Sequence, residues 1–229
     1  MPTVTFAEKA LHFYMGLREP NNIQNGISVI YPHKSKEVRD HLKLFLNTFF
    51  SDTRKRVFVL GINPGRFGSG ITGIPFTDPV ALERFCGINN TFLKRREMSS
   101  EFMYTFIDEW GGADAFYHDF FLSAVSPIGF VRYGANYNYY DDKELLRITK
   151  PFIVHTLQQQ CSFGARDTVI LLGIGKNQKK FIELNSEFGF FKNVFALEHP
   201  RFIMQYRRKS LKDYLKKYHE VFSQALRAS

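Results

Sequence analysis

The pattern of apolar and polar positions predicts helices that alternate with short buried strands. Apolar residues follow helical spacing over residues 5–17, 35–50, 79–86, 100–110, 141–160, 176–188 and 207–227. Short, mostly apolar runs predict strands over residues 27–31, 56–62, 120–125, 169–173 and 194–197. Because a proline disfavours helical backbone in the residue before it, Lys150-Pro151 is expected to break or kink the helix over 141–160.

Strands that alternate with helices predict an α/β fold of three layers, α/β/α, around a central, mainly parallel sheet of four strands. In such sheets, ligands bind beyond the carboxyl ends of the strands. The chain has 229 residues without an internal repeat or a long linker, which suits one domain. We therefore expect a single domain over residues 1–229, with residues 1–50 as an N-terminal helical extension packed on it.

Composition and charge narrow the class of protein. The chain is 44% hydrophobic and 23% charged, as ordinary globular proteins are. No apolar run approaches the roughly 18 residues needed to cross a bilayer, and the first residues lack a signal-peptide pattern, so a cytoplasmic protein is expected. Cys86 and Cys161 lack metal or redox spacing and are expected to be free thiols. A net charge of +9 favours a polyanionic partner without showing which one.

The most informative segment is residues 61–76, GINPGRFGSGITGIPF, which directly follows a predicted strand. It contains five glycines and two prolines, but neither the Gly-Lys-Ser/Thr ending of a P-loop nor the spacing of a dinucleotide fingerprint. Ordering so long a glycine-rich loop costs conformational entropy. We therefore expect an active site here; the alternative is a rigid connector without chemistry.

This segment resembles a known family. Asn63-Pro64-Gly65, Phe67-Gly68 and 72–76 (TGIPF) are similar, without gaps, to the first motif of the single-strand-selective monofunctional uracil-DNA glycosylases. Residues 198–201 (EHPR) resemble the His-Pro motif of the wider uracil-DNA glycosylase superfamily, and residues 117–130 resemble the segment between the two motifs. The resemblance extends from about residue 55 to about 215, and the chain looks like a divergent bacterial member.

The resemblance implies a monofunctional DNA glycosylase that flips out and hydrolytically removes deaminated or damaged bases, uracil among them, in base-excision repair. DNA would be its partner, and it would act as a monomer without a metal, a cofactor or a membrane. No lysine stands at the motif positions, so no lyase activity is expected.

The resemblance also implies catalytic roles. Asn63 would orient the attacking water; because an amide does not take up a proton near neutrality, the transition state would have to be dissociative. His199 would donate a hydrogen bond to the base oxygen that gains charge, a role worth ~3–4 kcal/mol. Phe76 would stack on the flipped base, worth ~1–3 kcal/mol. A turn role for Asn63, a structural role for His199 and a core position for Phe76 are the alternatives.

The pocket predicted from the resemblance is unusually open. Gly65 stands where stricter relatives carry a tyrosine that excludes larger pyrimidines. The asparagine that recognises uracil is missing, since Ala124 or Ser123 occupies its position. We therefore expect relaxed specificity, including xanthine or hypoxanthine, with Asn136 or Asn138 as substitutes. The predicted base-binding residues are Gly61, Ile62, Pro64, Gly65, Phe67, Phe76, Ser123, Ala124, Asn136 and Asn138.

Cationic and aromatic residues follow His199, as is typical of a DNA-binding segment. The resemblance indicates that residues 201–206 enter the duplex, whereas residues from Lys212 onward follow helical spacing and are expected to form a solvated face. The predicted DNA-binding residues are Arg66, Arg201, Phe202, Gln205, Tyr206, Arg207, Arg208 and Lys209.

Two other functions remain open at this point. A non-catalytic protein that binds damaged DNA would explain why Ala124 stands in place of the uracil-recognising asparagine. Retention of Asn63 and His199 argues against this function. A small-molecule hydrolase or transferase would use the glycine-rich loop but would not need the basic segment beside His199.

Overall fold

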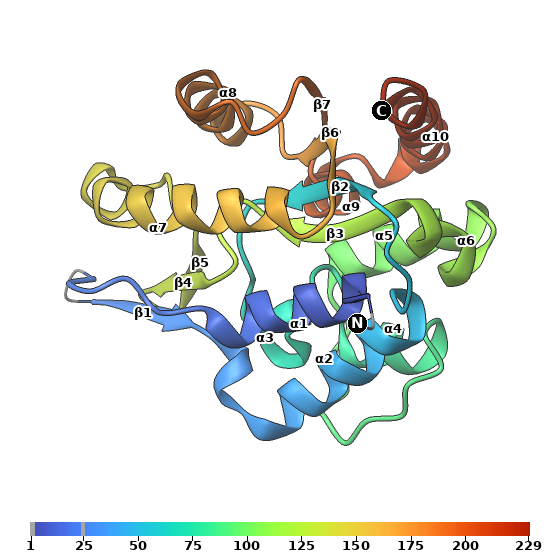
Figure 1. Cartoon of the computed structure of the whole chain (residues 1–229), viewed down its shortest axis with the longest axis horizontal. Coiled ribbons are helices and arrows are strands. Elements are labelled where there is room, and N and C mark those ends of the chain that lie inside the picture. The colour runs from blue at the N-terminus through green and yellow to red at the C-terminus, as the bar shows by residue number, and fades with distance from the viewer. Residues whose placement is uncertain (1–2, 24–25) are drawn as a thin grey trace.

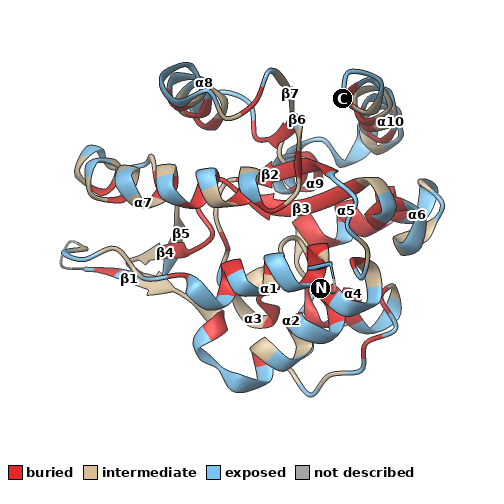
Figure 2. Ribbon diagram, in the orientation of Figure 1, coloured by how far each residue is buried: buried red, intermediate tan, exposed pale blue. Residues whose placement is uncertain are grey.

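The computed structural model describes residues 3–23 and 26–229 and is built around a parallel sheet. Its four strands lie in the order β3-β2-β6-β7. They are β2 (Arg56–Gly61), β3 (Phe120–Ala124), β6 (Ala165–Leu172) and β7 (Asn193–Leu197). Every residue of the central strand β2 and of the edge strand β3 is buried, as expected of a parallel sheet covered by helices on both faces (Figure 2). The four predicted core strands are confirmed, and β6 begins before the predicted residue 169.

Helices cover both faces of this sheet, which confirms the three-layer α/β/α fold. In Figure 1, α8 and α10 lie at the top and α1 and α2 at the bottom, with β2 and β3 between them. The helices are α1 (Phe6–Gly16), α2 (Lys36–Phe49), α3 (Gly68–Thr72), α4 (Pro79–Arg84), α5 (Met98–Glu109), α6 (Gly112–Asp119), α7 (Lys143–Ser162), α8 (Lys176–Phe188), α9 (Pro200–Tyr206) and α10 (Leu211–Arg227). Among the described residues, no helix is long and apolar enough to span a membrane.

The break expected at Pro151 does not occur, because α7 continues through this residue. The side chain of Asp142 accepts hydrogen bonds from the backbone N–H groups of Glu144 and Leu145, which starts the helix. Buried Ile153 and Leu157 then anchor its second half in the core. A proline removes one backbone hydrogen bond, and capping together with burial outweighs that loss here.

The C-terminal helix also differs from the prediction over 207–227. A short 3-10 turn (Arg208–Ser210) separates α9 from α10. The short helices α3, α6 and α9 were not predicted, since a helix of two turns or fewer leaves little periodicity in a sequence.

A second, smaller sheet of three antiparallel strands has the order β1-β4-β5. The predicted strand over 27–31 is its edge strand β1 (Ile27–Ile30), which pairs with β4 (Gly129–Arg132). A hairpin then leads to β5 (Ala135–Tyr137) through Tyr133 and Gly134, whose φ angles are 50° and 71°. Two successive positive φ angles are typical of a type I′ turn, which matches the twist of paired strands.

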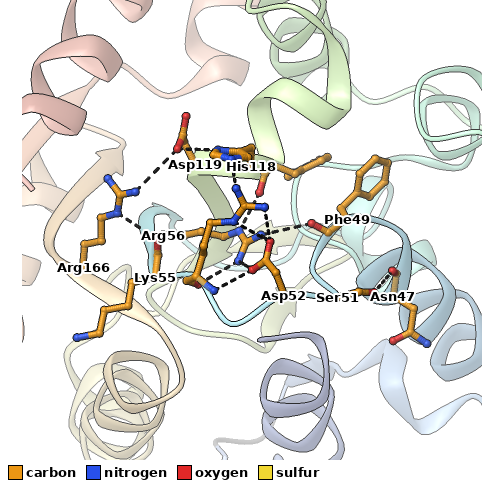
Figure 3. Close-up of polar contacts among 11 residues, drawn as sticks. Asn47, Phe49, Ser51, Asp52, Lys55, Arg56, His118, Asp119 and Arg166 are labelled. Carbon is orange, nitrogen blue, oxygen red and sulfur yellow. Dashed lines mark hydrogen bonds and ion pairs between the residues drawn. The ribbon is translucent and has the colours of Figure 1, made fainter. Parts of the chain in front are cut away.

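A buried arginine connects the N-terminal helix to the parallel sheet (Figure 3). Arg56 is 0% exposed, and its guanidinium lies 4.8 Å from the ring centres of both Phe6 and Phe50. It donates to both carboxylate oxygens of Asp52 at 2.9 Å and to the Tyr117 carbonyl at 2.8 Å. Because this buried charge is paired and hydrogen-bonded, it fixes Phe6 of α1 and Phe50 at the end of α2 against the start of β2.

Candidate active site

A cavity of about 680 Å³ lies at the carboxyl ends of the parallel strands. The ends of β2 and β3 and the residues after β7 contribute to its wall, as expected for an open α/β sheet. All of the predicted catalytic and base-binding residues line it: Gly61, Ile62, Asn63, Pro64, Gly65, Phe67, Phe76, Ser123, Ala124, Asn136, Asn138 and His199. Segments that are distant in the sequence therefore converge on one site.

The amide of Asn63 is held in one orientation by backbone groups. Its nitrogen donates to the carbonyl of Tyr137 at 3.2 Å, and its oxygen accepts the backbone N–H of Tyr139 at 3.2 Å. A carbonyl oxygen has two lone pairs, so one of them is left for a further donor such as water. Asn63 is therefore an oriented acceptor at the strand end rather than a simple turn residue.

The ring of Phe76 lies beside His199, with 5.9 Å between ring centres. Its φ of +57° places Phe76 in the left-handed region, which is costly for a residue with a side chain. Hydrogen bonds hold this turn: the hydroxyl of Thr72 donates to the carbonyl of Thr77 at 2.6 Å, and His33 bonds the carbonyl of Gly73 at 2.8 Å. The partly exposed ring lies at the cavity wall and is not a core residue.

His199 is the N-cap of α9 and presents one polar nitrogen that has no partner in its own helix. Its Nδ1 accepts the backbone N–H of Arg201 at 3.2 Å. Burial, together with the positive charge of Arg201, lowers the pKa of His199 to about 4. A neutral ring that accepts at Nδ1 carries its proton on Nε2. His199 can therefore donate a hydrogen bond from Nε2 without carrying a charge.

Gly65 provides the space in which Asn136 lies. A Cβ atom at position 65 would lie 2.9 Å from Nδ2 of Asn136. The oxygen of Asn136 accepts both the backbone N–H and the Nε–H of Arg66, at 3.0 and 3.3 Å, which uses both of its lone pairs, so only its nitrogen remains to contact a ligand. Asn138 also lines the cavity, and its backbone N–H donates to the carboxylate of Asp141.

Among the described residues, no side-chain amide lines the cavity at the end of β3. Ser123 donates its hydroxyl proton to Gln160 at 2.6 Å, and Gln160 in turn donates to the carbonyl of Ala124 at 3.4 Å. Ser123 is 1% exposed and Ala124 is 6% exposed. Neither residue can make the paired donor and acceptor contact of an asparagine.

The predicted DNA-binding residues divide into two groups. Arg66 and four residues of the α9 segment line the cavity, namely Arg201, Phe202, Gln205 and Tyr206. The other three, Arg207, Arg208 and Lys209, lie beyond its lining, and Arg208 forms an ion pair with Glu101 at 2.8 Å. Within the segment expected to enter the duplex, Ile203 and Met204 are buried because α9 packs one face against the core.

Several lining residues were not predicted from the sequence, among them two arginines and two residues of the N-terminal segment. Arg95 and Arg96 border the cavity, and the guanidinium of Arg95 lies 3.4 Å from the ring centre of Phe67. Their adjacent positive charges are visible in the sequence, but no sequence pattern indicates that they lie near residue 67. Tyr14 and His33 come from the N-terminal segment, for which no motif was recognised.

The two cysteines take no part in this site. Both are free, and neither lines the cavity. Burial raises the pKa of Cys86 to about 12, so its thiol is not ionised near neutrality. Within residues 3–23 and 26–229, no three His, Cys, Asp or Glu side chains gather as metal ligands.

Comparisons with known proteins agree with this geometry. Residues 48–223 match the model of the uracil DNA glycosylase superfamily. The chain is similar to the crystal structure of wild-type SMUG2 from Pedobacter heparinus, with 40% sequence identity and a TM-score of 0.93 over 99% of this chain and 100% of that one. None of the curated proteins gives a significant match.

The superfamily match spans most of the chain, and the structural match includes the N-terminal segment that the motifs did not reach. The two family motifs line the same cavity, with Asn63 from one and His199 from the other. The chain therefore belongs to the uracil DNA glycosylase superfamily, in its single-strand-selective monofunctional family, and is a DNA glycosylase.

Proposed function

We propose that this protein is a monofunctional glycosylase of base-excision repair that flips deaminated bases into the cavity and removes them by hydrolysis. Its substrates include xanthine and hypoxanthine as well as uracil. One observation supports this best: Asn63, Phe76 and a neutral His199 line one cavity whose wall is formed by the small residues Gly65 and Ala124.

In the proposed reaction, the N-glycosyl bond breaks and its electron pair leaves with the base. The Nε2–H of His199 stabilises the oxygen on which this charge collects. Water held by Asn63 adds to C1′ of the oxocarbenium-like sugar and releases its proton to solvent, because the amide cannot take it up. The products are the free base and an abasic site.

The cavity lining explains why strand cleavage is not expected. Lyase activity requires an amine that forms a Schiff base with the sugar. The cations among the lining residues are arginines, Arg66, Arg95, Arg96 and Arg201, and no lysine is among them. The abasic strand should therefore remain intact until alkali cleaves it.

Oligonucleotides that carry one uracil, xanthine, hypoxanthine or 5-hydroxymethyluracil test this proposal. Each is incubated with the protein and then treated with alkali, and strand breaks are counted. We expect breaks at uracil, xanthine and hypoxanthine, which Asn63→Ala and His199→Ala reduce by about 10²–10³-fold. Strong cleavage at uracil, with none at the other bases, would contradict the relaxed specificity.

A non-catalytic DNA-damage binder is the second candidate, because β3 lacks its uracil-recognising asparagine at Ala124. The same assay separates the two functions. Binding to uracil-containing DNA without any alkali-sensitive product would favour the binder.

A further inference from the structure

Two buried polar atoms in the cavity wall have no hydrogen-bond partner among the described residues. They are the hydroxyl oxygen of Tyr14, on α1, and Nδ1 of His33, in the turn before α2. The two residues are 2% and 4% exposed, and their ring centres are 4.8 Å apart. Both line the cavity that contains Phe76 and His199.

The polarity of each atom is fixed by its surroundings. His33 bonds the carbonyl of Gly73 through Nε2 at 2.8 Å, so Nε2 carries the proton and Nδ1 is a bare acceptor. Burial lowers the pKa of His33 to about 4, which keeps the ring neutral. Burial also raises the pKa of Tyr14 to about 12, so its hydroxyl keeps its proton and is a donor.

Ser123 is a polar residue that affects Tyr14. Its hydroxyl lowers the pKa of Tyr14 against the larger effect of burial, but by distance and angle the Tyr14 hydroxyl has no hydrogen-bond partner among the described residues. Ser123 gives its own proton to Gln160. The donor of Tyr14 therefore remains unpaired in the protein without its substrate.

An unpaired buried polar atom is costly, and such atoms in native proteins usually have a functional reason. Here one donor and one acceptor belong to neighbouring rings in one cavity wall, and a donor paired with an acceptor is what an asparagine side chain presents. That asparagine is what β3 lacks at Ala124 and Ser123. The complement of this pattern is an N–H next to a C=O, the lactam edge that uracil, xanthine and hypoxanthine share.

We propose that Tyr14 and His33 recognise the lactam edge of the flipped base in place of the missing asparagine. This inference rests on the proposed function and gives the N-terminal segment a part in specificity. The hydroxyl of Tyr14 donates to the C=O of the base, and Nδ1 of His33 accepts its N–H. Cytosine and adenine present the opposite pattern on the corresponding edge and are rejected.

A binding experiment tests this inference without requiring the reaction. Two oligonucleotides are compared by fluorescence anisotropy: one carries 2′-fluoro-deoxyuridine, which resists hydrolysis, and the other carries a tetrahydrofuran site without a base. Tyr14→Phe and His33→Gln are the test variants, since glutamine can still donate to Gly73. Tyr117→Phe is the matched control, because Tyr117 is equally buried but its hydroxyl has a partner in Tyr104 at 3.0 Å.

We expect each test variant to bind the uridine analogue about tenfold more weakly while binding the base-free DNA as wild type does. Tyr14→Phe should unfold at the wild-type temperature or above, because it removes an unpaired donor, whereas Tyr117→Phe should unfold at a lower temperature and keep its base binding. Equal losses on both oligonucleotides, or no loss on either, would overturn the inference. So would a selective loss in Asn138→Ala with Tyr14→Phe unchanged.

Cleavage of a uracil oligonucleotide is measured separately with the same preparations. Base-dependent binding that is lost in Tyr14→Phe, without any cleavage by wild type, would contradict the proposed reaction and leave the recognition site standing. Cleavage by wild type that both test variants retain at full rate would contradict the recognition site alone.

Discussion

Gly61 and Phe76 are matched in shape: a Cβ atom on Gly61 would lie 2.6 Å from Cζ of the Phe76 ring. The last residue of β2 therefore determines where the ring of Phe76 can lie. Because the ring also packs beside His199, its position is constrained from two sides.

Gly61→Ala should displace the Phe76 ring and weaken both folding and base removal. Overpacking of this kind costs ~1–3 kcal/mol of stability, and we expect a fall in excision rate of at least tenfold. Urea unfolding and single-turnover excision measure the two effects. Gly16→Ala is the control, because nothing lies within 4 Å of a Cβ there; a Gly61→Ala variant as active as this control would contradict the prediction.

Acid should destabilise the protein through its buried histidines. The pKa of both His33 and His199 is lowered from 6.5 to about 4, so the unfolded chain takes up protons there before the folded chain does. Their contribution to stability is therefore complete above pH 6.5 and is lost as the pH falls towards 4, with roughly 3 kcal/mol expected from His33. Urea unfolding between pH 4 and 8 measures this, and His33→Gln should flatten the profile; an unchanged slope would argue against it.

Arg95 and Arg96 should contact DNA phosphates at the cavity rim. Both are exposed, and among the described residues neither forms an ion pair. Replacing both with alanine should weaken DNA binding and reduce the slope of log K against log salt by about 1–2, since each lost phosphate contact removes about 0.7–0.9. Arg147→Ala, which removes an exposed ion pair with Glu144 on α7, is the control and should keep the wild-type slope.

Pro151→Ala should stabilise the protein, because alanine restores a backbone donor inside α7. We expect a gain of about 1–2 kcal/mol after allowing for the greater freedom of the unfolded chain. Thermal unfolding compares it with Gln158→Ala, an exposed change in the same helix that should shift stability by less than about 0.5 kcal/mol. A lower unfolding temperature for Pro151→Ala would show that α7 is adapted to the proline.

The core strands and the positions of Asn63 and His199 in the cavity could be predicted because their signals are local. The apolar run over 56–62 and the motif that contains Asn63 are contiguous, as is the His-Pro pair at His199. Tyr14 and His33 could not be predicted, since their place in the cavity depends on the tertiary contacts of α1 and of the turn before α2, such as the bond from His33 to Gly73. The same holds for Arg95, whose partner Phe67 is brought near only by the tertiary fold.

The continuity of α7 through Pro151 shows a different limit of prediction from the local sequence. Local propensity predicts a break there, and burial of residues in the next two turns overrides it. The buried Ile203 and Met204 show the same effect in α9. In both helices, packing of one face against the core determined the structure that is observed.

The guanidinium of Arg56 packs against the stacked rings of Phe6 and Phe50, and this arrangement has a consequence for how the chain unfolds. If α1 detached, the charge of Arg56 and the two aromatic rings would become exposed to water at the same time, at the N-terminal end of the central strand β2. We therefore expect α1 and the parallel sheet to form one cooperative unit, with a single unfolding transition for both. A protein shortened to begin after α2 should then lose the sheet as well as the helix.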